Sequence, residues 1–430
     1  MKSKQLYFVR YLIILFLFLS FSTGVSGMSL DLVLQQNPAI DYAEYKGKVV
    51  NKADGAPLAS TFLAVEGTNI STVSNNEGEF SLKIPNRLGD VNVIVSHLGF
   101  QSRSIPLDFF KQGEVVIKLD ETIEELSEVS LFTYTNPSAL VRNMLKNRGV
   151  NYLNDRANMT AFYRETIKRG RKNVSLSEAV VTIHKEAYDS SADDNIALVK
   201  ARKTADYDRL DTLALKLRGG PYNPLSIDIM KNPTNIFNYY DLSNFNFEFD
   251  KPTKINDRYL YVVNFEELIK EMPWYYGKLY IDAETFTLVK ASYNLNVDNR
   301  SAATQLFVKK KPGGTRVYPV DVHYEIQYRE RDGRWYFGYA DTQLEFVVNW
   351  KRRLFNSRYK INSELAVTDW QINPNGRVKK NDNFINPRIV MTDDISGFAD
   401  IAFWGENNII EPDKSIENAI DKIRKNLKDN

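Results

Sequence analysis

Two patterns of apolar and polar residues follow one another along this 430-residue chain. From Tyr45 to Leu119, short alternating runs are separated by Gly, Asp and Asn turns, about every 8 to 12 residues. This spacing is typical of an antiparallel β-sandwich, which we predict over residues 45–120. Within it, Gly55 and Gly78 stand where a hairpin needs a positive φ, a conformation that glycine adopts cheaply.

Longer alternating runs fill the region 136–412, which begins with the helix-start signal Asn136-Pro137-Ser138. Their alternation predicts a sheet with one packed face and one wet face. We expect strands at 158–168, 173–188, 196–202, 259–265, 274–281, 286–295, 306–311, 316–328, 334–350 and 359–367.

The predicted fold class is therefore mainly β, a β-rich α+β protein. It combines an N-terminal seven-stranded-type β-sandwich with a larger antiparallel sheet, curved or half-barrel, and a few helices. Residues 121–135 are expected to link the two parts. Residues 413–430 are expected to form a C-terminal helix whose apolar stripe docks on the sheet. The stripe consists of Ile416, Ala419, Ile420, Ile423 and Leu427.

The first residues predict export. Lys2, Lys4 and Arg10 precede the apolar run Tyr11–Phe21, and small residues follow up to Gly27. This order predicts a signal peptide at residues 1–27, and the apolar run is shorter than the ~20 residues of a membrane-spanning helix. We expect a periplasmic or outer-membrane-associated protein without a transmembrane segment in the mature chain. Because the chain has no cysteine, it is predicted not to be a lipoprotein and to fold without disulfides.

The charge balance argues against nucleic-acid partners. Loss of the signal peptide would remove three positive charges from a formal net charge of +2 and leave −1. Capture of nucleic acid needs a concentrated basic face. The basic clusters Lys168–Lys172, Lys309–Lys311 and Lys351–Arg353 are short and far apart in the sequence, so we interpret each as a solvated loop or strand edge.

Five segments of the first region stand in a fixed order: Gly47–Val50, Gly55–Leu58, Val65–Asn69, Gly78–Leu82 and Val95–Phe100. In order and spacing they resemble the carboxypeptidase regulatory-like domain, a transthyretin-like β-sandwich. The tail that follows fits the version common in envelope proteins of Bacteroidetes. The resemblance covers under a fifth of the chain and implies an accessory sandwich, because the peptidase domain itself is missing.

The second region resembles a family found behind such domains in exported proteins of Bacteroidetes. The matching pieces are Asn151-Tyr152, Ala161–Glu165, Gly277–Asp282 and Phe403–Pro412. The hairpin that begins at Gly277 is also similar to the sheets of outer-membrane lipoprotein carriers. That likeness implies an incompletely closed, curved sheet around a helix, with an apolar concave face.

No motif in the sequence indicates catalysis, a cofactor or a metal. His97, His184 and His323 lack the His-Glu-x-x-His spacing of a zinc site, and no Gly-x-Ser-x-Gly elbow is present. We expect the many aromatic residues to pack in the core, where Arg164 is compatible with an Arg–acid pair. The neighbouring acids Asp193-Asp194, Asp206/Asp208/Asp211 and Asp393-Asp394 are typical of solvated loops.

We therefore predict a non-catalytic binding or interaction protein of the periplasm or outer membrane, with no cofactor and no catalytic or metal-binding residues. Its partner would be an envelope protein or an apolar or glycan ligand. Two alternatives remain. One is an outer-membrane TonB-linked receptor component, since such transporters often carry this front domain; a 22-strand barrel at ~10 residues per strand exceeds the remaining length. The other is a hydrolase without a recognisable motif.

Overall fold

In the computed structural model, all elements described below belong to one compact unit within residues 42–430. The predicted signal peptide and residues 123–132 of the predicted linker lie outside the described residues. The structure describes residues 41–122, 133–205, 220–237, 242–255, 258–308, 313–351, 354–378, 383–386, 398, 400 and 402–428. In these ranges no helix is both long and apolar enough to cross a membrane.

The first region forms the predicted β-sandwich. One sheet has the order β4-β1-β7 and the other the order β3-β2-β5-β6. Their apolar side chains meet in a core of their own that includes Val49, Leu63 and Ile117. The strands are β1 (Tyr42–Asn51), β2 (Phe62–Val65), β3 (Ser71–Val73), β4 (Glu79–Pro85), β5 (Asn92–Ser96), β6 (Arg103–Pro106) and β7 (Val115–Leu119); η1 (Asn86–Leu88) and α2 (Leu107–Phe110) lie between strands.

Gly55 and Gly78 adopt the predicted positive φ, at 74° and 78°. At Gly78 a side chain is excluded for a second reason, because a Cβ atom would lie 2.4 Å from the carbonyl oxygen of Val49.

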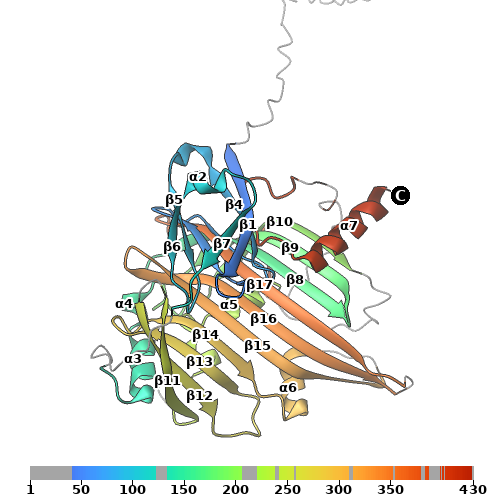
Figure 1. The fold of residues 1–430 in the computed structure, drawn as a ribbon. Helices are drawn as coiled ribbons and strands as arrows, with labels where there is room; N and C mark the ends of the chain where they lie inside the picture. The colour runs from blue at the N-terminus through green and yellow to red at the C-terminus, as the bar shows by residue number, and fades with distance from the viewer. Residues whose placement is uncertain are drawn as a thin grey trace, which may run out of the picture. The chain divides into compact units, whose positions relative to one another are not determined.

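The second region forms a ten-stranded antiparallel sheet with the order β10-β9-β8-β17-β16-β15-β14-β13-β12-β11 (Figure 1). The last strand, β17, pairs with β8 on one side and β16 on the other, and so joins the two halves. The sheet is not closed, as predicted, because β10 and β11 lie at its two edges. The strands are β8 (Ala157–Arg169), β9 (Lys172–Lys185), β10 (Asn195–Ala205), β11 (Phe245–Ile255), β12 (Arg258–Glu267), β13 (Tyr275–Asp282), β14 (Leu288–Leu295), β15 (Thr315–Arg331), β16 (Arg334–Trp350) and β17 (Ser357–Ile372).

One predicted strand is wrong at its start. Residues Arg300–Phe307 form the helix α6, because the Asn299 side chain accepts a hydrogen bond from the Ala302 N–H and caps the helix. Residues 309–311 of that predicted strand lie outside the described part of the chain.

One face of the large sheet, which we call the helix face, is covered by other segments of the chain. The helix α3 (Pro137–Lys146) begins at Asn136, as predicted, and buries Leu140, Val141, Met144 and Leu145. The short helices α4 (Arg148–Asn151), α5 (Tyr222–Ser226) and η2 (Pro233–Asn235) follow.

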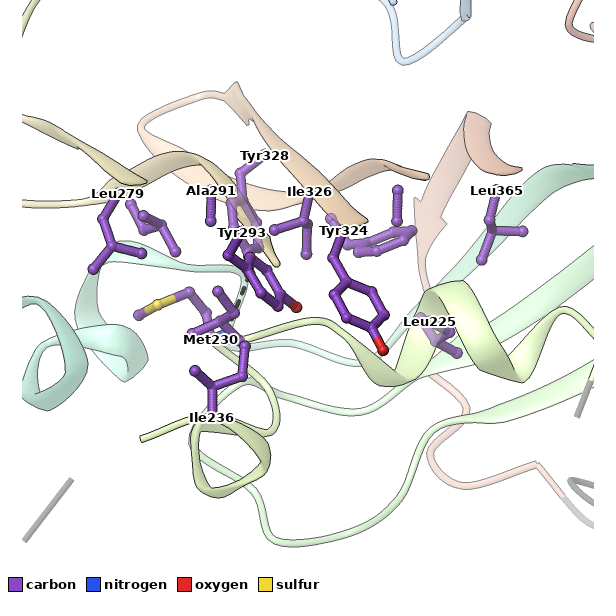
Figure 2. Close-up of a cluster of buried hydrophobic side chains, with 14 of the residues drawn as sticks. Leu225, Met230, Ile236, Leu279, Ala291, Tyr293, Tyr324, Ile326, Tyr328 and Leu365 are labelled. Carbon is purple, nitrogen blue, oxygen red and sulfur yellow. Dashed lines mark hydrogen bonds between the residues drawn. The ribbon is translucent and has the colours of Figure 1, made fainter. Parts of the chain in front are cut away.

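Figure 2 shows how the connection between β10 and β11 reaches the helix face. Leu225, Met230 and Ile236 of this connection belong to the same buried cluster as Leu279 and Ile326 of the sheet. Tyr293 and Tyr324 stack with their ring centres 5.1 Å apart. The apolar face expected from the sequence is thus packed against the chain's own segments.

The opposite face, which we call the sandwich face, carries the β-sandwich and the C-terminal segment. Phe62 and Val73 of the sandwich pack against Phe162 of β8 and Tyr339 of β16 in one cluster with Trp404. The C-terminal helix α7 (Lys414–Lys428) also docks on the sheet, as predicted from its stripe. Its residues Ile416 and Ile420 are buried with Leu176 of β9 and Phe398.

The close approach of β14 to Gly277 of β13 allows the strand register to be tested by substitution. A Cβ atom there would lie 2.3 Å from the backbone oxygen of Ser292 and 2.5 Å from Cα of Tyr293. Because backbone atoms cannot move aside cheaply, we expect Gly277→Ala to lower the free energy of unfolding by about 1–3 kcal/mol, measured by urea denaturation. Gly313→Ala is the matched control, since nothing lies within 4 Å of a Cβ there. Equal effects of the two substitutions would contradict this register.

Candidate functional site

A row of charged side chains crosses the sandwich face of the large sheet. Strand register places six of them opposite one another on consecutive strands, from β15 to β10. Cβ atoms of directly opposite residues in an antiparallel pair lie about 4.5–5.5 Å apart, so each member can interact with its neighbours. In order across the sheet, the charged row consists of Glu325, Asp341, Glu364, Arg164, Glu178 and Arg202.

The β8–β10 half of the row is a fully paired ionic cluster. Nε of Arg164 lies 2.8 Å from Oε1 of Glu178, and Nε of Arg202 lies 2.7 Å from Oε2. Burial alone would raise the pKa of Glu178, but the two guanidinium groups outweigh it and hold that pKa below its usual value. Because buried charges are tolerated only when paired, each member of this cluster depends on the others.

The same cluster fixes the C-terminal segment. Nη2 of Arg164 donates to the carbonyl oxygen of Ile410 at 2.7 Å. The guanidinium of Arg202 lies over the rings of Phe398 and Trp404, at 4.6 and 5.0 Å from their centres. Such contacts are favourable when they are shielded from water. The segment before α7 therefore covers Arg164 and Arg202 and supplies partners that the strands do not provide.

The other half of the row contains two acids that face each other. Asp341 and Glu364 are register partners on β16 and β17, and both are buried. Burial and the nearby Glu364 raise the pKa of Asp341 well above its usual value. Burial also raises the pKa of Glu364, although Arg164 acts in the opposite direction. Both shifts favour the protonated form, so we infer that this pair binds a proton more readily than two exposed acids would.

Charge counting leads to the same conclusion. Lys290 lies 2.9 Å from Glu325 and adds a third cation to Arg164 and Arg202. Three cations face four carboxyl groups, so the assembly is neutral when one of the four is protonated. Neutral groups also donate to both acids: the Tyr339 hydroxyl donates to Glu364 at 3.2 Å, and Gln343 donates to Asp341 at 2.7 Å.

Glu364 also forms part of the wall of a pocket, which we call the interface pocket. Its volume is about 320 Å³, at the lower end of the range for small-ligand sites. A sandwich turn, the strands β8, β15, β16 and β17, and the start of α7 enclose it. The lining residues are Asn76, Thr166, Lys168, Asp321, Gln343, Leu344, Glu345, Lys360, Ile361, Asn362, Glu364, Asp413 and Ile416.

The interface pocket is polar and contains an unused acceptor. Oδ1 of Asn362 is buried and finds no hydrogen-bond donor among the described residues. Glu345 is held by Arg358 and Lys360, both of them largely exposed cations. Buried acceptors are normally satisfied, so Asn362 and Glu364 are suited to receive N–H or O–H groups of a bound molecule.

A second ionic cluster lies on the helix face. Nζ of Lys185 lies 2.7 Å from Asp194 and 2.8 Å from Asp228, and the Tyr328 hydroxyl donates to Asp228 at 2.9 Å. Burial would lower the pKa of Lys185, but the two carboxylates raise it overall. This cluster attaches the connection between β10 and β11 to the sheet.

The structure does not bring the three histidines together. His184 on β9 shares a hydrogen bond with Asn158, and His323 on β15 shares one with Asn294. Three strands lie between β9 and β15. His97 of the sandwich lies 3.1 Å from Oγ1 of Thr61, and burial, helped by Lys290, lowers its pKa to about 4. Among the described residues no three His, Cys, Asp or Glu side chains are placed to hold a metal ion.

Of the other candidate residues from the sequence, some form ion pairs within the fold and the rest lie outside the described residues. Asp194 belongs to the Lys185 cluster, and Arg164 does pair with an acid. Asp206, Asp208, Asp211, Asp393 and Asp394 lie outside the described residues. Sequence reasoning missed the charged row. Its only signal there is a charged residue in the middle of each apolar strand, such as Glu178 between Ser177 and Ala179.

A family model described as the CarboxypepD_reg-like domain matches residues 45–131. The sandwich and the resemblance of its turns agree with this match, so the chain contains a CarboxypepD_reg-like domain. No curated protein matches the chain significantly.

Several solved structures are similar to the chain at low identity. One is an outer membrane lipoprotein-sorting protein domain from Vibrio parahaemolyticus, 11% identical, with a TM-score of 0.24, covering 56% of this chain and 94% of that one. A LolA superfamily protein from Nitrosomonas europaea is 8% identical, with a TM-score of 0.21 and the same coverage. Lipovitellin is 8% identical, with a TM-score of 0.26, covering 54% of this chain and 27% of that one. TM-scores this low do not establish a shared fold.

The shared proton makes the stability of the fold depend on pH. Because folding raises the pKa of Asp341, the folded chain binds this proton more tightly than the unfolded chain, and stability falls as pH rises above the usual value of 3.8. Asp341→Asn removes that loss, so we expect it to stabilise the protein at pH 8 by on the order of 1–3 kcal/mol and much less at pH 4. Urea denaturation at both pH values measures this. Asp332→Asn, in an exposed turn, is the control; parallel pH curves for wild type and Asp341→Asn would contradict a shared proton.

In the paired half of the row, neutralising an acid should lower the stability of the fold instead of raising it. Glu178→Gln keeps the shape of the side chain but leaves Arg164 and Arg202 without their anion, so we expect a loss of about 3–5 kcal/mol. Glu345→Gln removes an acid whose partners are exposed and should cost less than about 1 kcal/mol. Thermal unfolding of both variants compares them, and similar losses would show that the buried cluster has no special weight.

Proposed function

We propose that the chain is a non-catalytic binding protein of the bacterial cell envelope, and that it holds a small polar ligand in the interface pocket. The proposal rests mainly on the residues that line this pocket. They include Glu364, whose carboxyl is buried, and Asn362, whose side-chain oxygen has no hydrogen-bond donor among the described residues.

The envelope location rests on the sequence. The signal-peptide pattern predicts export, and the CarboxypepD_reg-like domain resembles the version found in envelope proteins of Bacteroidetes. That the protein is periplasmic or outer-membrane-associated, and that its source belongs to this group, are parts of the proposal.

Firm docking of the sandwich supports a preformed pocket. β17 continues past the end of its pairing with β16, and its free carbonyl groups accept hydrogen bonds from the sandwich. Nδ2 of Asn69 donates to the oxygen of Trp370 at 2.7 Å, and Oγ of Ser71 to that of Val367 at 3.2 Å. Arg331 donates to the carbonyl oxygens of Gly67 and Thr68. A site that exists before binding loses less entropy when a ligand enters.

The lining residues favour a ligand with amine and hydroxyl groups. Asp321, Glu345, Glu364 and Asp413 are acids, against the two cations Lys168 and Lys360. A protonated amine would meet complementary charge there, and hydroxyl groups would satisfy the amides. The volume suits a molecule of the size of a monosaccharide or a dipeptide.

An apolar ligand is less well supported by the geometry. On the helix face it would have to displace Leu225, Met230 and Ile236, which are buried against the sheet. The polar pocket needs no such rearrangement.

One observation favours a hydrolase as the second candidate. Two facing carboxyl groups with raised pKa values can act as acid and base, and Asp341 and Glu364 form such a pair. Asp341 does not line the interface pocket, however, so only Glu364 would reach a substrate there, and we favour binding without bond cleavage.

The test uses D-glucosamine, which carries both an amine and hydroxyl groups, and D-glucose, which carries hydroxyl groups only. Saturation-transfer NMR with the chain from Met28 should show saturable binding of glucosamine, tighter than binding of glucose. Glu364→Gln should weaken glucosamine binding about tenfold or more, since it removes a charged acceptor. Asn362→Ala should weaken both sugars.

Glu284→Gln, in an exposed turn away from the pocket, is the matched control and should bind like wild type. Circular dichroism of each variant verifies folding. Absence of binding for both sugars, or equal binding by Glu364→Gln and wild type, would overturn the proposal. Cleavage of a p-nitrophenyl glucosaminide that Glu364→Gln abolishes would favour the hydrolase instead.

A further inference from the structure

Strand register brings two basic segments, which are separated in the sequence, to one end of the large sheet. Arg169 at the end of β8 is opposite Tyr359 near the start of β17, and Trp350 at the end of β16 is opposite Thr315 at the start of β15. The β8–β9 turn and the β16–β17 connection therefore share this end. We call it the loop end; its described residues include Arg171, Lys172, Arg316, Lys351, Leu354 and Phe355.

Two of the basic clusters meet at the loop end, although they are far apart in the sequence. Two of the three contribute to it, through Arg171 and Lys172 in one and Lys351 in the other, and these three side chains are exposed. Arg316 at the start of β15 is also exposed. Lys309–Lys311, Arg352 and Arg353 lie outside the described residues.

Two large apolar side chains stand among these cations. Leu354 is 97% exposed and Phe355 is 84% exposed, more than any other large apolar residue of the described chain. They lie in the connection between two strands of 17 and 16 residues. Isolated apolar residues are normal on a protein surface, but an adjacent pair at a hairpin tip, flanked by cations, is not required by any packing in the fold.

More exposed apolar side chains lie along the same end. Tyr275 of β13 pairs with Leu295 of β14, which places the β12–β13 connection there as well. That connection exposes Leu268, Ile269 and Met272, and α6, which contacts β15, exposes Leu306. Asn294 near the end of β14 is opposite His323, eight residues from Thr315, so this connection is set back along the sheet from the β16–β17 connection. Exposed apolar groups at several connections on this side of the sheet suit a flat partner better than a small ligand.

The charges select the kind of flat partner. Of the exposed acids near this end, Glu271 and Asp298 lie on the β12–β14 side and Asp321 lies on β15, set back from the tip, whereas Arg171, Lys172, Arg316 and Lys351 lie at the tip itself. Lys270 is paired with Glu266. Cations beside protruding apolar groups match an anionic lipid surface, in which phosphates lie at the level of the headgroups and acyl chains lie just beneath.

We infer that the loop end docks on the surface of an anionic lipid bilayer. Leu354 and Phe355 enter the headgroup layer, and Arg171, Lys172 and Lys351 contact lipid phosphates. This inference does not depend on the interface pocket or on its ligand.

Vesicle co-sedimentation tests it with the chain from Met28. We expect binding to vesicles of phosphatidylcholine with phosphatidylglycerol, and much weaker binding to phosphatidylcholine alone. High salt should weaken the binding, because the cationic contacts are exposed. The double variant L354A/F355A should bind about tenfold or more weakly, since several buried methylene equivalents are lost. The double variant R171E/K172E should also bind about tenfold or more weakly.

V116A/V150A is the matched control, because these valines are 55% and 68% exposed but lie in the sandwich and in α4. It should bind vesicles like wild type, as should Glu364→Gln, whose defect would be confined to the pocket. Equal binding to both kinds of vesicle, no binding to either, or full binding by L354A/F355A would overturn the inference. Capture of an acidic protein without vesicle binding would do so too, and would identify a protein partner instead.

Discussion

The buried contact between Arg164, Glu178 and Arg202 constrains the rest of the structure. These three charged side chains are buried in the middle of the sheet, away from water. A buried charge is costly unless it has partners. The structure satisfies them with each other and with the carbonyl oxygen of Ile410. The segment before α7 is therefore held in place by the charges that it covers, and α7 and the interface pocket follow from its position.

The two faces of the large sheet do different work. The helix face buries a continuous apolar core against α3 and the connection between β10 and β11, which stabilises the sheet as a unit. The sandwich face is half polar, so it can hold the sandwich through directed hydrogen bonds such as that of Asn69 with Trp370. Directed bonds fix an orientation, whereas apolar contacts tolerate sliding. The polar face is therefore the one on which a preformed pocket is expected.

Local pattern was enough to predict most of the fold. Alternation and turns located the sandwich, the long strands and the docked stripe of α7, and Asn136 marked the start of α3. The strand predicted from Leu306 failed because the cap formed by Asn299 favours a helix, and a cap is a weak signal beside an apolar run. The charged row and the loop end could not be predicted. Both arise from pairing between distant strands, such as Glu364 with Arg164, and a single sequence does not reveal register.

The interface pocket and the loop end share the strands β8, β15, β16 and β17, which has a physical consequence. Lys168 lines the pocket, and the next residue along β8, Arg169, is at the loop end. Thr166, deeper in the pocket, is three residues from that end, about 10 Å at the rise of a β-strand. This distance is similar to the Debye length at physiological salt, about 8 Å. An anionic bilayer at the loop end would concentrate amine-bearing molecules within that layer, which is the ligand chemistry that Glu364 and Asn362 favour. Docking would then raise the occupancy of the pocket without any change in its shape.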